Sequence, residues 1–156
     1  MTTEHEQLIQ RIRASAELIE KTVAAIPPAR QTVAPKPGEW SVKQILLHTR
    51  DVAMLAYGLR IRRLLIETDF MPTSYEEEEY RALNPGDAES VDTIVKMLAA
   101  EHELVANLLA PLPEAAWERS VRHPEGGTRT IAFFARRFAE HADEHAAQIA
   151  ALRATS

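Results

Sequence analysis

The stretch "RRFAEHADEHAAQIAAL", residues 136–152, has the pattern of one amphipathic helix with two histidines on its apolar side. At about 100° per residue, His141 and His145 fall within about 60° of Phe134 on a helical wheel. The same sector contains Phe138, Gln148, Ile149 and Leu152. Because residues at i and i+4 share one face of a helix, both imidazoles point in the same direction. The stretch therefore predicts a core-facing helix that carries two side chains able to bind a metal ion.

Three further amphipathic runs come before this helix, and together they predict helices over residues 4–26, 41–68, 89–110 and 130–153. Pro27 and Pro28 end the first run, and Ser41 with Gln44 has the pattern of a capping box at the start of the second. Long helices with few strand signals between them are typical of an all-α four-helix bundle. We expect a single domain over residues 1–156 with the helices running up and down.

The connections between these helices contain weaker signals. Ser74 comes before "YEEEEYRAL", which predicts a short helix within residues 69–88, and one further turn is expected at 114–117. The run of four glutamates at 76–79 is interpreted as a solvated face that could also attract a cation loosely. The segment "TRTIAFF", residues 128–134, has some β-propensity, but it leads directly into a helical run, and we expect no strand there.

Composition excludes several classes of site. The chain has no cysteine, so a transition-metal site would have to use histidine and carboxylate ligands. A net charge of −5 argues against a nucleic-acid surface, which usually carries a basic patch. No run approaches the roughly 18 apolar residues that a membrane span needs, and the N-terminus is polar and acidic, unlike a signal peptide. We therefore expect a cytoplasmic protein.

The predicted second helix repeats the construction of the last one. His48 lies at the centre of an apolar stripe that comprises Ile45, Val52, Leu55, Leu59 and Ile66. A buried imidazole with an unpaired nitrogen costs about 1–3 kcal/mol. One such histidine can be satisfied by a carbonyl or hydroxyl group, whereas three in one interior are harder to satisfy separately. A shared divalent ion would satisfy one nitrogen on each ring, and separately packed core histidines are the alternative.

Two segments of the sequence resemble a known family. "GEWSVKQILLHTRD", residues 38–51, and "HADEHAAQI", residues 141–149, are similar to the motifs of the DinB-like superfamily of metal-binding four-helix bundles. The family pattern has a Trp-Ser pair opening the second helix, a histidine seven residues after the serine, and H-x-x-x-H followed by Gln-Ile on the last helix. The matching residues here are Trp40, Ser41, His48, His141, His145, Gln148 and Ile149.

This resemblance implies a metal site, with His48, His141 and His145 as ligands of a divalent ion, most commonly nickel or zinc. It also implies one of three functions. The leading one is transfer of a low-molecular-weight thiol by a thiol S-transferase, and the second, an alternative, is hydrolysis in which the ion activates water. The third is a non-catalytic metal-binding module of the stress response. The resemblance further implies a homodimer.

Two other residues could assist such a site. His102 lies on a predicted apolar stripe of the third helix and could be a fourth ligand, a proton shuttle or a satisfied core histidine. Gln148, one turn beyond His145, could hydrogen-bond a ligand ring or bound water, or could lie at the edge of the core. If the third function holds, His102 is the candidate to block the open coordination position.

Overall fold

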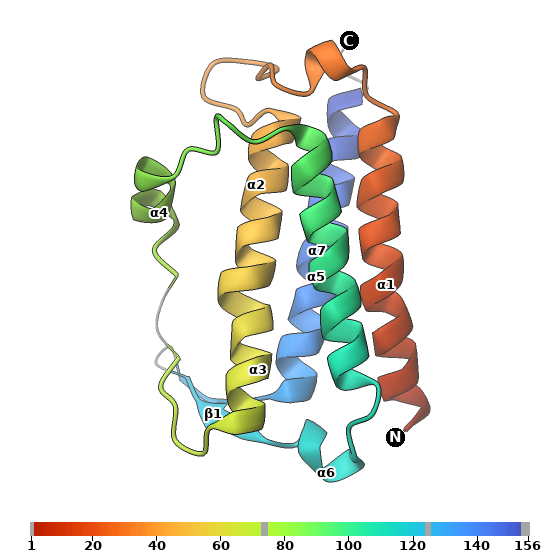
Figure 1. The fold of residues 1–156 in the computed structure, drawn as a ribbon, viewed down its shortest axis with the longest axis vertical. Helices are drawn as coiled ribbons and strands as arrows, with labels where there is room; N and C mark the ends of the chain where they lie inside the picture. The colour runs from red at the N-terminus through yellow and green to blue at the C-terminus, as the bar shows by residue number, and fades with distance from the viewer. Residues whose placement is uncertain (1, 73–74, 124–125, 154–156) are drawn as a thin grey trace.

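A computed structural model describes residues 2–72, 75–123 and 126–153, and it shows an all-α four-helix bundle (Figure 1). The first helix, α1, spans Thr3–Ala24, and the last, α7, spans Ile131–Arg153. The second consists of α2 (Val42–Val52), the π-helix η2 (Ala53–Tyr57) and α3 (Gly58–Ile66) in one continuous rod. The third, α5, spans Val91–Leu109. The four predicted helices are therefore present at nearly the predicted positions.

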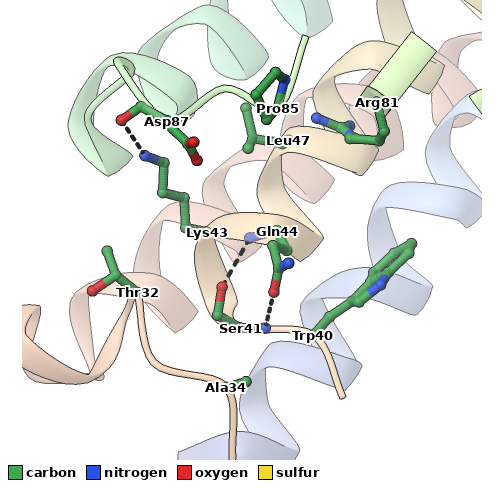
Figure 2. A pocket seen from close by; sticks show the side chains of 10 residues that line it. All are labelled: Thr32, Ala34, Trp40, Ser41, Lys43, Gln44, Leu47, Arg81, Pro85 and Asp87. Carbon is green, nitrogen blue, oxygen red and sulfur yellow. Dashed lines mark hydrogen bonds between the residues drawn. The ribbon is translucent and has the colours of Figure 1, made fainter. Parts of the chain in front are cut away.

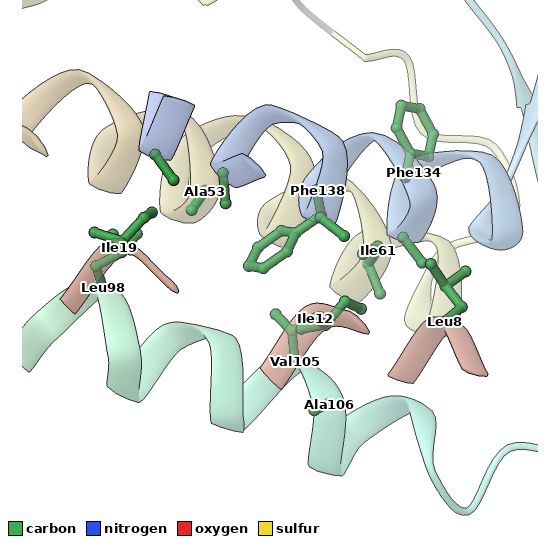
Figure 3. Close-up of a cluster of buried hydrophobic side chains, with 14 of the residues drawn as sticks. Leu8, Ile12, Ile19, Ala53, Ile61, Leu98, Val105, Ala106, Phe134 and Phe138 are labelled. Atoms are coloured by element: carbon green, nitrogen blue, oxygen red, sulfur yellow. The ribbon is translucent and has the colours of Figure 1, made fainter. Parts of the chain in front are cut away.

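Apolar side chains from all four helices form one core (Figure 3). The helix α1 packs against α5 and α7, and α2 also packs against α5 and α7. Ile12, Ile45, Val105 and Phe134 are each fully buried. Burial of such side chains contributes about 1.5–3 kcal/mol each, and this drives the amphipathic faces together. On α2 and α7, the turns next to the histidines are packed into this core, so the core fixes the positions of those histidines.

The start of α2 is fixed by local hydrogen bonds. The Ser41 hydroxyl accepts a hydrogen bond from the Gln44 backbone N–H, and the Gln44 side chain accepts one from the Ser41 N–H, at 3.3 and 2.9 Å. This confirms the predicted capping box, which satisfies two backbone donors that a helix start leaves unpaired. It sets the register of the helix on which His48 lies.

The order of helix directions differs from the simple up-and-down arrangement expected from the sequence. Figure 1 shows α1 running up, α2 to α3 running down, α5 also running down and α7 running up. The described residues of the connection between α3 and α5, 67–72 and 75–90, are called the strap below and return along the bundle before α5 begins. The 24 residues of the whole connection can reach about 80 Å when extended, whereas a 19-residue helix is about 30 Å long. This length is enough for the strap to return beside α2, where Glu77 contacts His48.

The π-helix η2 changes which side chains of the second rod are buried. The Gly58 N–H donates to the Ala53 carbonyl five residues earlier, so the chain contains about one extra residue in this turn. The later residues are rotated by about 100° relative to a regular helix. The expected core positions Leu55, Leu59 and Ile66 are for this reason exposed, at 40%, 43% and 80%, and that part of the predicted stripe is wrong. Ile61 and Leu64 are buried in their place.

At Gly58 the side chain of Glu101 on α5 lies directly against the rod. A Cβ atom at this position would lie 2.4 Å from Glu101 Oε1 and 2.6 Å from the Ala53 carbonyl oxygen. Only glycine fits there, because real Cβ contacts are not made at such distances. The π-helix and the close packing of α5 therefore depend on the same residue.

The remaining elements are short. They are η1 (Pro28–Arg30), α4 (Glu77–Leu83), α6 (Glu114–Trp117) and the antiparallel strands β1 (Ser120–Arg122) and β2 (Thr128–Thr130). The strand β2 corrects the expectation that residues 128–134 contain no strand, since a hairpin comes before the helix. The Ser74 helix start lies outside the described residues. No helix in the described part of the chain is long and apolar enough to cross a membrane.

Candidate metal centre

The three histidines that the sequence singles out lie together between α2 and α7. The Nε2 atom of His141 is 3.0 Å from that of His48 and 3.1 Å from that of His145. One nitrogen from each ring lies within 4.8 Å of the other two. The spacing of four residues on α7 stacks His141 and His145 on one face, and packing of α2 against α7 brings His48 to them. The convergence predicted from the apolar stripes is therefore present.

The outer nitrogens of two rings contact hydrogen-bond acceptors. His48 Nδ1 contacts Glu77 Oε1, and His145 Nδ1 lies 2.8 Å from Gln148 Oε1. A carboxylate oxygen and an amide oxygen can only accept, so each Nδ1 carries the proton. In the neutral rings, the Nε2 atoms of His48 and His145 are then unprotonated.

With this protonation pattern, the lone pairs at the centre of the cluster need a hydrogen-bond donor or a cation. The lone pairs of His48 Nε2 and His145 Nε2 both face His141 Nε2. A single N–H on His141 can satisfy one of these lone pairs and leaves the other without a donor. One cation between the three atoms would satisfy all of them together. The side chains present therefore fit a divalent ion, and imidazole ligands suit zinc and nickel.

The surroundings of His141 and His145 favour their neutral rings, which is the form that binds metal. Burial, together with the nearby His145 and His48, lowers the pKa of His141 to about 3. Burial also lowers the pKa of His145, against a raising effect of the Gln148 hydrogen bond. Protons therefore compete weakly for these two nitrogens near neutral pH.

Two aromatic residues border the cluster. The centroid of the Trp40 ring lies 5.2 Å from that of His48, in a tilted arrangement. The Tyr57 and His141 rings are T-shaped to each other, with 5.8 Å between their centroids. In a regular helix Tyr57 would lie about 180° from His48, whereas one extra residue in the turn reduces this to about 80°. The π-helix thus brings Tyr57 to the side of the metal-binding face.

Burial lowers the pKa of Arg137, which lies one turn before His141, but hydrogen bonds with Glu140 and Tyr57 more than offset this and raise that pKa above its ordinary value.

A pocket of about 470 Å³ has Trp40 in its lining (Figure 2), and the ring of the same tryptophan packs on His48. Figure 2 shows Ser41 and Gln44, with their two capping hydrogen bonds, between the side chains of Lys43 and Trp40. The Lys43 ammonium donates to the Asp87 backbone carbonyl at 3.1 Å on the side of the pocket away from Trp40 (Figure 2). The lining mixes apolar and charged groups, as small-molecule pockets commonly do.

The structure decides between the roles that the sequence left open for His102 and Gln148. His102 is fully buried, its Nδ1 lies 2.9 Å from the Leu98 carbonyl, and its ring packs on Phe138 at 4.5 Å. It does not belong to the group of histidines whose nitrogens converge. Gln148 does hydrogen-bond a candidate ligand ring, as one of the two interpretations expected.

The burial of His102 predicts a pH dependence of the metal-free protein. Burial lowers the pKa of His102 to about 4, although the Leu98 carbonyl raises it. In the unfolded chain His102 binds a proton below about pH 6.5, whereas in the folded chain it does so only below about pH 4. The free energy of unfolding therefore decreases as the pH falls through this window. We expect His102 to account for roughly 2–3 kcal/mol of the loss between pH 7 and 4.5.

Urea unfolding of the metal-free protein at the two pH values measures this effect. His102→Leu should lose less stability between them than the wild type, because leucine does not titrate. Equal losses in both proteins would show that His102 does not cause the pH dependence.

The sequence did not identify Glu77 or Tyr57 as residues of this site. The only signal for Glu77 was the glutamate run at 76–79, and nothing in four identical residues distinguishes one of them as a site residue. Tyr57 gave no signal, because its position depends on an extra residue in the helical turn.

Comparisons with known proteins agree with this architecture. A "Putative metal-dependent hydrolase" of Bacillus mycoides is 36% identical over 118 residues, 74% of this chain and 66% of that protein. A protein of the same name from Oceanobacillus iheyensis is 26% identical over 144 residues, 92% of this chain and 83% of its own length.

Two solved structures have the same fold. The structure of YfiT from Bacillus subtilis, described as a probable metal-dependent hydrolase with an unusual four-helix bundle topology, superimposes with a TM-score of 0.80 at 19% identity. That match covers 100% of this chain and 91% of YfiT. A conserved protein of Enterococcus faecalis gives a TM-score of 0.71 at 15% identity, over 99% and 98% of the two chains. The sequence model of the DinB superfamily matches residues 11–149, nearly the whole chain, and the protein therefore belongs to the DinB superfamily.

Proposed function

We propose that this protein is a metal-dependent enzyme that binds one divalent ion through the Nε2 atoms of His48, His141 and His145. The observation that carries the proposal is the set of inward-facing Nε2 lone pairs, two of which are fixed by acceptors on the opposite ring nitrogen. Three protein ligands with an open position are typical of catalytic sites. An ion held there would lower the pKa of bound water or stabilise a thiolate.

A catalytic role is better supported than a purely structural one. The non-catalytic alternative needs a side chain that blocks the remaining coordination position, with His102 as the candidate. His102 is instead tied to the Leu98 carbonyl and packed on Phe138. Its position supports a site that is open to a small molecule.

Hydrolysis is the reaction we propose first. The relatives from Bacillus mycoides and Oceanobacillus iheyensis carry the name of metal-dependent hydrolase, which supports this assignment. Tyr57 and Arg137, which hydrogen-bond each other, lie beside His141, where they would help to stabilise negative charge on a substrate oxygen. The pocket bordered by Trp40 is of a size that suits a small-molecule substrate.

Transfer of a low-molecular-weight thiol is the second candidate. The converging group contains three histidines and no carboxylate among the described residues, so an ion held by it would have no acidic side chain among its ligands. A thiol needs less help, because its pKa of about 8.5 is far below that of water. Nickel and zinc both suit an imidazole site that also accepts a thiolate.

Cobalt-substituted protein tests the proposal and separates the two reactions. We expect close to one equivalent of metal per chain, and hydrolysis of p-nitrophenyl acetate that the metal-free protein lacks. Titration with 2-mercaptoethanol should leave the absorption spectrum unchanged if water is the nucleophile, and should add thiolate-to-cobalt bands if a thiol is. A folded protein that binds no cobalt at micromolar concentrations would contradict both.

A further inference from the structure

The strap places one carboxylate on the outer nitrogen of a candidate metal ligand. Glu77, the first residue of α4, contacts His48 Nδ1 through its Oε1 atom. The side chains of His48 and Glu77 are 13% and 27% exposed, so the contact is largely shielded from water. Such shielding strengthens a charged hydrogen bond, because solvent screens it less.

Glu77 differs from its neighbours in the glutamate run. Glu76, Glu78 and Glu79 are exposed, whereas Glu77 is partly buried. One helical face of α4 points toward α2, and Arg81, one turn after Glu77, lies on that same face. Three glutamates of the run at 76–79 are therefore solvated, and Glu77 is directed to the site. Four identical residues in a row could not indicate which of them this would be.

Charged groups dock the strap on the same part of α2. Arg81 of α4 lies 2.8 Å from Asp51, whose side chain is only 4% exposed. Near the other end of the strap, Glu89 accepts hydrogen bonds from the Arg50 guanidinium, one of them at 3.2 Å. The contacts of Glu77, Arg81 and Glu89 thus fall on residues 48–51, within one turn of helix.

We propose that Glu77 is a positioning residue that couples the occupancy of the metal site to docking of the strap. The inference rests on the proposed metal binding by His48, His141 and His145. By accepting the Nδ1 proton, the Glu77 carboxylate keeps His48 Nε2 free for the ion and orients the ring toward His141. The negative charge also makes Nε2 a more basic ligand.

Thermodynamic linkage makes this coupling reciprocal. If the docked Glu77 strengthens metal binding by some factor, then the bound metal must strengthen docking of Glu77 by the same factor. Partners of metal-binding histidines typically change metal affinity by about 10–100-fold. The strap should therefore be held more firmly in the metal-loaded protein than in the metal-free protein.

Zinc affinity, measured by competition with a chelator, tests the first half of the coupling. We expect Glu77→Ala to weaken zinc binding by about 10–100-fold, and Glu77→Gln to lie between this variant and the wild type. Glutamine keeps an oxygen that accepts the Nδ1 proton but lacks the charge. Glu78→Ala is the matched control, because it removes an exposed glutamate from the same helix and should bind zinc as the wild type does.

Hydrogen exchange of the α4 amides, with and without zinc, tests the second half. Zinc should slow exchange at Tyr80 and Asn84, whose N–H groups bond within the strap, in the wild type and in Glu78→Ala. The slowing should be absent in Glu77→Ala. Equal zinc affinity of Glu77→Ala and Glu78→Ala, or equal slowing in both, would overturn the coupling while leaving the metal site in place. A wild type that binds no zinc would overturn the proposed function and the coupling with it.

Discussion

His141→Ala is expected to lose its metal during dialysis against a mild chelator that leaves the wild type with a full equivalent. His141 Nε2 is the atom that lies close to both other Nε2 atoms, at 3.0 and 3.1 Å. Its removal turns three-point coordination into coordination by two separate rings. Even changes outside the ligand set cost about 10–100-fold in metal affinity, so the loss of a ligand should exceed about 100-fold. Elemental analysis after dialysis measures the result.

The control for this experiment is His5→Ala. His5 is buried, but its ring stacks on Trp117 at 4.0 Å, outside the converging group. The substitution should lower stability and leave the metal content of the folded protein unchanged. Retention of a full equivalent by His141→Ala would mean that His141 and His145 are two histidines packed on a core face.

Phe138→Ala is expected to destabilise the protein by about 3–5 kcal/mol. The Phe138 side chain is only 2% exposed and lies in the core cluster of α7, in contact with the His102 ring (Figure 3). Truncation removes apolar surface from the core and leaves a cavity that the surrounding helices cannot fill completely. A loss of this size is a large share of the 5–15 kcal/mol by which a typical domain is stable.

Urea unfolding of the metal-free protein measures this loss, with Leu104→Ala on α5 as the control. Leu104 is apolar but 58% exposed, so its truncation should change stability by no more than about 0.5 kcal/mol. Similar losses in the two variants would show that the packing around Phe138 is loose and that this part of the core is wrongly described.

Local rules predicted the helices and the three histidines well. The capping box at Ser41, the proline pair after residue 26 and the 3.6-residue period each depend on groups within one or two turns. His48, His141 and His145 were found because an imidazole on an apolar stripe is expected to face the core, where an unpaired ring nitrogen is costly. Such signals persist in the sequence because they do not depend on how the helices are arranged.

The arrangement of the helices was the part that the sequence did not determine. The strap is long enough to connect α3 to either end of α5, so its length could not show that α5 runs parallel to α2 and α3. This choice decides where the strap lies, and hence that Glu77 rather than Glu76 or Glu78 contacts His48.

The π-helix was missed for a related reason. Its extra residue occurs where the Glu101 side chain of α5 lies against Gly58, a contact between segments about 40 residues apart. From Ala53 onward the helical wheel therefore gave the wrong face, exposing Leu59 and moving Tyr57 toward His141. The sequence by itself determined the helices and the metal-competent histidines, because hydrogen bonding and burial within a helix are local. Only the tertiary structure decided which carboxylate and which tyrosine meet them, because those contacts depend on the direction and rotation of packed helices.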